Sequence, residues 1–419
     1  MPESEGRWHL FEAFGIEAEY MIVDAKTLKV LPIADSVLKR LANSHQPVSD
    51  AERGSVAWSN ELVAHLIELK CNGPKTNLKE IQLSFAEELA FVNGILKTEY
   101  GAKLMPSAMH PLFNPETETK LWPYDEEGIY ATYHKIFNCR GHGWSNLQSV
   151  HINLPFYDEE EFGRLHAAVR IILPLIPALA ASSPLVQGRF TGLSNSRLSY
   201  YLENQKRIPS IIGSVIPERV FSYQGYKSLL SGIYADIAPF DPELILRHEW
   251  LNSRAAVARF ERNAIEIRLM DIQECPKADF AIISAIVSVI QALVQENWLS
   301  YAKQKEVDEK ELKKVFLSCM KNGEKALITE KAYLDIFGFK EPMTAQDLWL
   351  KIVDNLSQQS DLVMSDFYTD LHFILEKGSL ATRISKALKS EQGPPSPAAI
   401  LAVYKTLCDN LEQDTFFRN

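Results

Sequence analysis

The chain has 419 residues, of which 46% are hydrophobic and 23% charged, an ordinary balance for one large or two modest globular domains. Its formal net charge of −10 argues against a nucleic-acid-binding surface, which needs an excess of basic residues. A small anionic ligand stays compatible with this charge, because a bound metal ion can supply local positive charge.

The cysteines and the first residues favour a cytoplasmic protein. The five cysteines form no CxxC pair, and an odd, scattered set fits a reducing compartment better than a disulfide framework. The opening sequence MPESEGRWHLFEAFG lacks the basic region and apolar core of a signal peptide. Some cysteines could be reactive, but inert thiols in the core are the more ordinary interpretation of Cys71, Cys139 and Cys275.

The first predicted strand, Gly15–Val23, carries two carboxylates among residues that favour burial. Glu17 and Glu19 alternate with Ile16 and Tyr20. Because side chains alternate across a strand, both glutamates point to the same face. Two like charges side by side repel, and burying either is costly, so a neighbouring group must compensate them.

The secondary structure of the next acidic segment, around 59–71, is ambiguous. Glu61, His65 and Glu68 follow an i, i+4, i+7 spacing, the polar stripe of an ordinary amphipathic helix. If Leu62–Cys71 is a strand, a separation of seven places the two glutamates on opposite faces unless a bulge or loop intervenes. The residues alone leave both interpretations open.

Two later segments repeat the pattern of the first strand. Ser149–Pro155 is predicted to be a strand, and Ala255–Asp271 a hairpin that turns at 261–263. The polar residues that share one face are His151 and Asn153 in the former, and Glu266 and Arg268 in the latter. Any half-exposed strand shows such alternation, so each strand alone has a simple explanation.

Helical patterns fill most of the remaining chain. The predicted helices are 77–100, 160–181 with two prolines inside it, 277–304, 308–322, and several within 331–419, broken at 391–397. The apolar run Phe280–Val294 is shorter than the ~20 residues of a membrane span, so we expect a core helix and no membrane association. The stretch 186–197 lacks phosphate-loop spacing and is predicted to be a surface loop. Together the elements predict an α+β fold with helices on one side of a mostly antiparallel sheet.

The kinds of polar residue favour a metal site over a solvated strand face. A solvated face would mix lysine, threonine, serine and glutamine, whereas these segments supply five carboxylates and one imidazole: Glu17, Glu19, Glu61, Glu68, Glu266 and His151. Such groups are ligands for Mg²⁺ or Mn²⁺, and two or three ions would remove the repulsion. Divalent cations with an arginine nearby suit phosphoryl transfer from ATP.

Taken in order, these pieces resemble the glutamate–cysteine ligase family 2, the carboxylate–amine ligases related to glutamine synthetase. The resembling motifs cover roughly residues 14–295, and they are Gly15-Ile-Glu-Ala-Glu-Tyr20, Asn60-Glu61, Ile67-Glu68-Leu69, Val150-His151-Ile-Asn153, Ala181-Ser-Ser-Pro184, Gly188-Arg-Phe-Thr-Gly192, Ser196-Arg197 and Ala264-Ile-Glu266-Ile-Arg268. The resemblance favours a strand with an interruption between Glu61 and Glu68.

The resemblance implies a glutamine synthetase-like catalytic domain over 1–300, a curved sheet backed by helices, with a helical region over 301–419 packed on it. It implies one metal site made by Glu19, Glu61 and Glu68, and a second made by Glu17, His151 and Glu266. It implies that Arg268 contacts the γ-phosphate of ATP and that Glu266 and Glu17 are also catalytic residues. The implied substrate-binding residues are Arg197, Arg189, Thr191 and Asn153.

The function implied is an ATP-dependent ligase that forms an amide of the γ-glutamyl type through an acyl phosphate. The expected partners are ATP, Mg²⁺ or Mn²⁺, and small amino acids or amines, and a homo-oligomer is compatible with the sequence. The amine stays open, because no motif recognises a thiol. Two alternatives remain: a phosphotransferase like the guanidino kinases, which stops at phosphoryl transfer, and a metal-dependent hydrolase that works without ATP.

Overall fold

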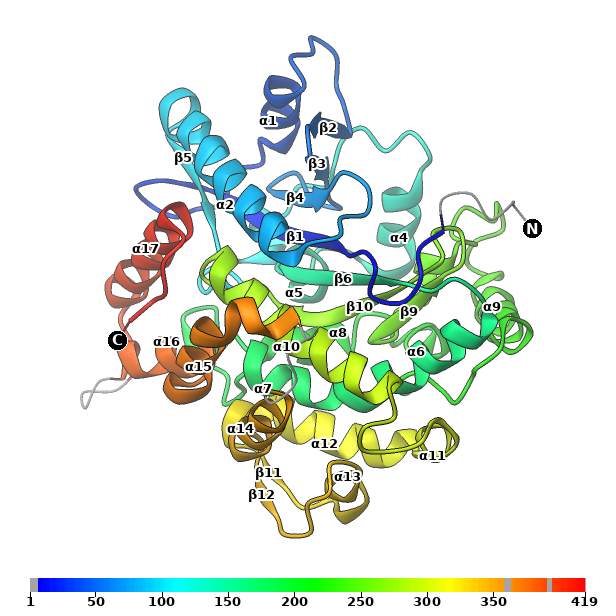
Figure 1. The fold of residues 1–419 in the computed structure, drawn as a ribbon. Helices are drawn as coiled ribbons and strands as arrows, with labels where there is room; N and C mark the ends of the chain where they lie inside the picture. Colours follow the sequence, from blue (N-terminus) through cyan, green and yellow to red (C-terminus); the bar gives the residue numbers. More distant parts are fainter. Residues whose placement is uncertain (1–6, 358–362, 390–393, 419) are drawn as a thin grey trace.

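An antiparallel sheet of eight strands forms the centre of the computed structural model, which describes residues 7–357, 363–389 and 394–418 (Figure 1). The strand order is β2-β3-β4-β1-β6-β10-β9, and β5 pairs with the end of β1. The strands are β1 (Gly15–Asp24), β2 (Asp50–Arg53), β3 (Val56–Asn60), β4 (Leu66–Cys71), β5 (Ala102–Met105), β6 (Ser149–Pro155), β9 (Ala256–Arg259) and β10 (Ala264–Asp271). The predicted α+β class and its antiparallel sheet are therefore confirmed.

Helices surround this sheet, and two short hairpins lie outside it. The hairpins pair β7 (Leu185–Val186) with β8 (Arg189–Phe190), and β11 (Leu327–Ile328) with β12 (Met343–Thr344). The α-helices are α1 (Ala34–Leu41), α2 (Leu78–Ile95), α3 (Pro115–Glu118), α4 (Ile129–Phe137), α5 (His142–Ser145), α6 (Glu159–Ile172), α7 (Ile176–Ala180), α8 (Ser196–Tyr201), α9 (Tyr223–Ile237), α10 (Pro276–Val294), α11 (Tyr301–Glu306), α12 (Glu309–Asn322), α13 (Lys331–Ile336), α14 (Ala345–Leu356), α15 (Tyr368–Lys377), α16 (Leu380–Leu388) and α17 (Pro397–Gln413).

The alternation of β1 separates the core from the polar face of the sheet. Ile16, Ala18 and Tyr20 are buried in one hydrophobic core with the apolar faces of α2 and α10. The long helices α2, α6 and α10 lie on this side of the sheet (Figure 1). The intervening Glu17 and Glu19 are half-buried and face the opposite side. One strand thus supplies core residues to one face and polar residues to the other, as its period of two requires.

Helix α10 is the apolar core helix predicted from the sequence, but it ends earlier than expected. Among the described residues, Glu159–Ala180 and Pro276–Val294 are the two helical stretches long and apolar enough to cross a membrane, and both are largely buried inside the protein. The prediction of one helix up to residue 304 is wrong, because Glu296 adopts a left-handed conformation with φ 63°. The amides of Glu296 and Asn297 bond the carbonyls of Leu293 and Ala292, the pattern of a Schellman cap.

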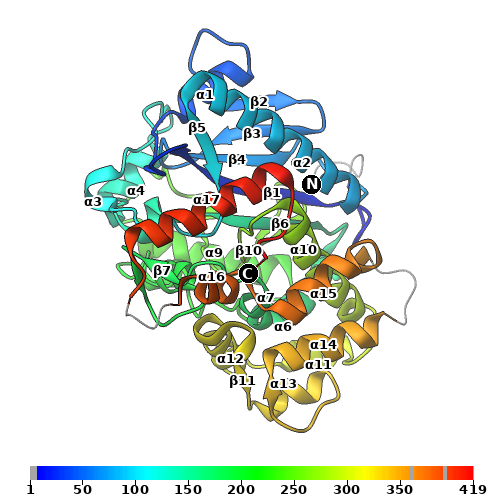
Figure 2. The ribbon, with the colours of Figure 1, turned by 90° about the vertical axis from the view of Figure 1, so that its left-hand side faces the viewer.

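The helices after residue 300 share the core of the sheet. Trp349 of α14 is buried and donates its indole N–H to the Leu175 carbonyl at 3.0 Å. Tyr333 of α13 bonds the Ile171 carbonyl at 2.8 Å. Helix α17 lies beside β5 and α2 at the other edge (Figure 2). One hydrophobic cluster contains residues from before and after residue 300, so the predicted division into two domains at that residue stays a prediction.

Candidate active site

The predicted metal ligands meet in one cavity of about 510 Å³ on the polar face of the sheet. All six line it: Glu17, Glu19, Glu61, Glu68, His151 and Glu266. The short helices α4, α5 and α8 contribute to its opposite wall, so the helices are not restricted to one side of the sheet as predicted. A sheet face that carries charge is thereby partly closed off from solvent.

The strand register brings these side chains together. Glu19 of β1 lies opposite Glu68 of β4, and Glu17 lies opposite His151 of β6. Glu266 of β10 pairs with Asn153, two residues further along β6. Side chains that are directly opposite on one face lie about 5 Å apart, within reach of a shared ligand. The register of four strands therefore builds the cluster from residues far apart in sequence.

The ambiguous segment from Glu61 to Glu68 is a hairpin, and the amphipathic-helix interpretation is wrong. Strand β3 ends at Asn60, a turn follows, and β4 begins at Leu66. The interruption lets Glu61 and Glu68 reach the same cavity despite their odd separation. The hydroxyl of Ser59 also donates to Glu68 Oε1 at 3.0 Å, across the hairpin.

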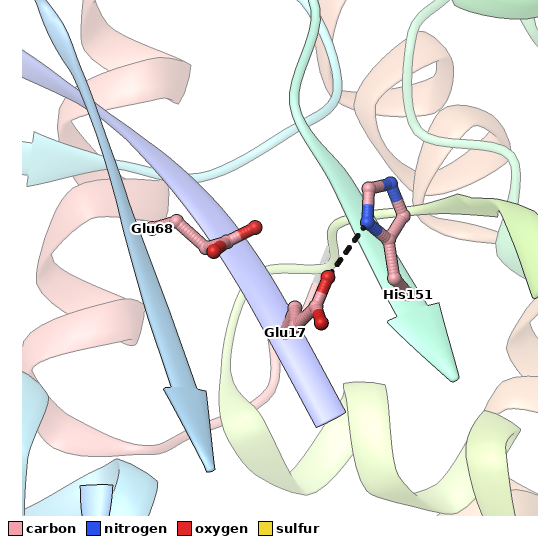
Figure 3. Close-up of side chains that lie close together, drawn as sticks. All are labelled: Glu17, Glu68 and His151. Atoms are coloured by element: carbon pink, nitrogen blue, oxygen red, sulfur yellow. Dashed lines mark hydrogen bonds and ion pairs between the residues drawn. The ribbon is translucent and has the colours of Figure 1, made fainter. Parts of the chain in front are cut away.

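Two overlapping groups of ligand atoms occupy this cluster, and Glu68 belongs to both. One atom from each of Glu19, Glu61 and Glu68 lies within 4.8 Å of the others, and the same holds for Glu17, Glu68 and His151. The first group is the predicted first site. The second contains Glu68 where the prediction had Glu266, whose carboxylate lies 3.9 Å from His151 Nδ1. Figure 3 shows Glu17, Glu68 and His151 converging, with the imidazole 3.1 Å from Glu17.

The electrostatics of the cluster show an excess of negative charge at the end near Glu61. Burial and the neighbouring Glu68 raise the pKa of Glu61 well above its ordinary range. Burial and Glu17 raise the pKa of Glu68 to about 8. Burial lowers the pKa of His151, but its hydrogen bond to Glu17 and the charges of Glu19 and Glu266 outweigh this effect and raise it to about 9. The charge of nearby Lys70 does not outweigh burial and repulsion at Glu68, so divalent cations could supply the missing positive charge.

Glu266, by contrast, is held by arginines. Arg268 Nε donates to Glu266 Oε1 at 2.5 Å, and Arg259 Nη1 donates to Oε2 at 2.7 Å. Burial opposes ionisation, but Arg268, His151 and Arg259 together lower the pKa of this carboxyl to about 2. A break in register between β10 and β6 beyond Ile267 lies beside Arg268, and Glu266 and Arg268 both line the cavity. Positive charge is thus fixed at the β10 edge of the cavity.

The four predicted substrate-binding residues lie in three different places. Arg197 lines the cavity, yet its Nε is paired with Asp271 at 2.6 Å and its Nη2 bonds the Leu269 carbonyl at 2.8 Å. Asn153 donates to Glu17 Oε1 at 3.2 Å and lines an adjoining cavity.

Arg189 and Thr191 do not line the active-site cavity, and their assignment as substrate-binding residues stays a prediction. Both are exposed on the β7–β8 hairpin, where the interpretation of 186–197 as a plain loop missed two short strands. Thr191 instead bonds the Ser196 hydroxyl at 2.7 Å, at the start of α8. The physical reason is the turn at Gln187-Gly188, where both residues have positive φ and reverse the chain at the surface.

Several cavity residues were not singled out by the sequence analysis. They are Lys70, Arg259 and Arg262 among the basic residues, and Tyr130, Tyr133, Trp144, Tyr201 and Trp250 among the aromatic ones. Arg259 ends a strand in which every residue is buried and the three preceding residues are apolar, so no alternation marked it. The aromatic residues come from short helices and loops, where no periodicity marks a residue that faces a cavity.

Sequence comparison gives a family for this fold and site. A family model described as Glutamate-cysteine ligase family 2 (GCS2) matches residues 13–395. An uncharacterized protein of Archaeoglobus fulgidus is 38% identical over 282 residues, which cover 67% of this chain and 75% of that protein. A protein of Bradyrhizobium sp. strain ORS 278, provisionally named glutamate–cysteine ligase 2, is 28% identical over 300 residues. That match covers 69% of this chain and 62% of the Bradyrhizobium protein.

Solved structures with the same fold come from more distant proteins. The glutamate–cysteine ligase of Francisella tularensis in complex with AMP superposes with a TM-score of 0.60 at 11% identity, covering 95% of this chain and 88% of the other. A bifunctional glutathione synthetase from Pasteurella multocida gives 0.60 at 12% identity, covering 97% of this chain and 52% of that one. At such low identities the likeness shows the fold alone.

Proposed function

The chain belongs to glutamate–cysteine ligase family 2, a family of ATP-dependent carbon–nitrogen ligases, and we propose that it joins a carboxylate to an amine through an acyl phosphate. We further propose that its fold is of the glutamine synthetase type. The observation that carries the proposal is the pair of overlapping ligand groups on one sheet face, next to an arginine-clamped glutamate. This arrangement suits phosphoryl transfer, which depends on charge neutralisation and positioning more than on a strong base.

The donor set fits two or three Mg²⁺ or Mn²⁺ ions, the cofactors that we propose. Carboxylate oxygens with one imidazole are suitable ligands, and the raised pKa values of Glu61 and Glu68 support a need for added positive charge there. Glu19, Glu61 and Glu68 would hold one ion; Glu17 and His151, with Glu68 or Glu266, would hold the other. Such ions supply Lewis-acid neutralisation of phosphate oxygens.

The protein's own residues suggest an orientation for ATP. A second cavity of about 350 Å³ adjoins the first at Glu17, Lys70 and Arg262. Beyond these residues it is lined by apolar and aromatic groups, including Trp8, Phe14 and Pro74. A base could stack in this part while Lys70 and Arg262 face its phosphates. This orientation supports Glu17 as the residue nearer the phosphates and Glu19 as the one nearer the substrate carboxylate.

In this proposal Arg268 and Arg259 hold Glu266 and provide positive charge for the γ-phosphate. Their guanidinium groups keep Glu266 ionised and occupy the cavity wall where the γ-phosphate would lie. Since a guanidinium binds phosphate oxygens in a forked geometry, Arg268 can exchange its carboxylate partner for the transferred group. The aromatic residues Tyr133, Trp144 and Trp250 limit the access of water, which would hydrolyse an acyl phosphate.

A product assay tests the proposal. We expect purified protein with ATP, Mg²⁺, glutamate and a panel of amines to release ADP and to form an amide detectable by mass spectrometry. With hydroxylamine as the amine, trapping of the acyl phosphate should give a hydroxamate. A phosphorylated amine or guanidine as the final product would favour the phosphotransferase alternative, and turnover without ATP would favour the hydrolase.

A further inference from the structure

A third cavity opens beside the Glu61 end of the active site, and the reaction proposed above does not account for it. It has a volume of about 420 Å³, and it shares Tyr130, Tyr133 and Trp250 with the active-site cavity. Asn60, the last residue of β3, lines this side cavity, and the adjacent Glu61 lines the active site. The side cavity therefore adjoins the active-site cavity at these three rings, next to Glu61. Its size is within the range of small-molecule sites, and it exceeds what a cysteine side chain needs.

Aromatic rings form much of the wall of this cavity. Trp122 and Tyr124 pack edge to face with ring centroids 5.6 Å apart, and Tyr133 and Trp250 lie 5.9 Å apart. Tyr130 is fixed by a hydrogen bond of 3.0 Å that its hydroxyl accepts from the Asn60 side chain. Rings that are held by one another in this way present preorganised faces to a ligand, and such faces attract cations.

The negative charge of the side cavity also favours a cationic ligand. Its lining residues, all within the described part of the chain, include Asp125, Glu126 and Glu127 and contain no lysine, arginine or histidine. Asp125 has a structural task, because its Oδ2 accepts the Ala131 amide at 2.8 Å in the first turn of α4. The charge available to a ligand therefore comes mainly from the exposed Glu126 and Glu127. This lining disfavours phosphate and carboxylate groups, whereas the cavity at the Glu17 end contains Lys70 and Arg262.

We propose that this side cavity binds the distal ammonium group of the amine substrate, so that the amine is a diamine or polyamine without a carboxylate. The inference rests on the proposed ligase function and specifies its second substrate. One nitrogen of the diamine, after losing a proton to solvent, attacks the acyl carbon; the C–N bond forms, the C–O bond to phosphate breaks, phosphate leaves with the electron pair, and the attacking nitrogen gives its second proton to solvent. The second nitrogen stays protonated between the aromatic rings and the two glutamates.

Paired substrates test the role of the distal charge. Putrescine and butylamine present the same attacking amine and differ mainly in the second ammonium group. In the ADP-release assay with glutamate, we expect kcat/KM for putrescine to exceed that for butylamine by about tenfold, the effect of one cation in an aromatic and acidic site. Spermidine should resemble putrescine. Higher kcat/KM for cysteine or for lysine than for putrescine and spermidine would overturn the proposal.

Variants test the residues. The double variant E126Q/E127Q should lower the ratio of kcat/KM for putrescine to kcat/KM for butylamine at least threefold. Tyr124→Leu should also lower the preference for putrescine over butylamine, whereas Tyr124→Phe, which keeps the aromatic face, should not. The matched control is Glu87→Gln, an exposed glutamate of α2 outside every cavity described above. An unchanged preference in E126Q/E127Q would refute the proposal.

A binding measurement separates this proposal from the ligase function. Putrescine can be titrated into the protein with Mg²⁺ and ADP present, following the heat of binding and the total tryptophan fluorescence, to which Trp122 and Trp250 of the side cavity contribute. One result would be that no amine supports ADP release, but putrescine binds and E126Q/E127Q weakens its binding at least threefold. This result would support diamine binding in the side cavity and refute the ligase function. If ADP release occurs with other amines while putrescine neither binds nor reacts, the ligase function stands and this proposal fails.

Discussion

The affinity of the protein for Mg²⁺ should depend steeply on pH, because the carboxylate cluster holds protons that a cation must displace. Glu68 is one such carboxylate, because burial and Glu17 raise its pKa to about 8. A carboxyl group with a raised pKa is protonated below that value, and a protonated carboxyl is a poor metal ligand. Binding should therefore strengthen as pH rises and level off above the pKa.

The size of the effect follows from the fraction of ionised Glu68. With a pKa of about 8, roughly a tenth of Glu68 is ionised at pH 7 and roughly a hundredth at pH 6. The apparent dissociation constant should then fall by about tenfold from pH 6 to pH 7 and by about fivefold from pH 7 to pH 8. Glu61, whose pKa is raised too, adds to the slope.

Isothermal titration calorimetry with Mg²⁺ in two buffers of different ionisation enthalpy measures both the affinity and the protons released. We expect about one proton released per bound ion at pH 7. Without metal, the raised pKa values also mean that the folded state binds more protons than the unfolded state from about pH 4.5 to 8, so the stability of the metal-free protein should fall as pH rises through that window. Equal Mg²⁺ affinity at pH 6 and pH 8, with no proton release, would refute this account.

Four further predictions follow from single contacts. Glu17→Gln should abolish ATP turnover, measured as ADP release, while circular dichroism shows an unchanged fold, since the residue is a proposed metal ligand on a half-exposed strand face. Arg268→Met should lower kcat at least a hundredfold with a smaller change in the affinity for nucleotide, measured by steady-state kinetics and ADP titration. Arg383→Met should cost about 3 kcal/mol in urea unfolding, because it leaves the fully buried Glu274 without its partner. Iodoacetamide at neutral pH should leave activity intact, because burial raises the pKa of Cys71, the one half-exposed thiol among the described residues, to about 11.

The sheet face could be predicted from sequence because its signal is local. A period of two in β1 and β6 fixes which side chains share a face, and the structure places Glu17, Glu19 and His151 accordingly. The hairpin between Glu61 and Glu68 was harder, since a turn there carries no glycine or proline and the spacing imitates a helix. Only the resemblance to a family selected the correct alternative.

What could not be predicted depends on long-range placement. The end of α10 relies on a left-handed Glu296, a conformation that glycine adopts far more readily, so no residue type marked the end of this helix. The pairing of Arg259 with Glu266 needs the register between β9 and β10, and the position of Trp250 needs the path of a loop. Arg189 and Thr191 were assigned by resemblance alone, and the fold places them on a surface hairpin.

The distribution of charge across the site supports a division of labour along the sheet. At the β10 edge, Arg268 and Arg259 neutralise Glu266, so this end needs no added cation to remain ionised. At the β3–β4 edge, Glu61 and Glu68 lack such partners, so metal ions are most strongly favoured there. An anionic nucleotide is then favoured at the end that contains basic residues, and a cationic amine at the aromatic and acidic end. The acyl phosphate would form between these two ends of the site. The nucleotide would be attracted to the basic end and the amine to the acidic end, so neither would have to cross the subsite of the other.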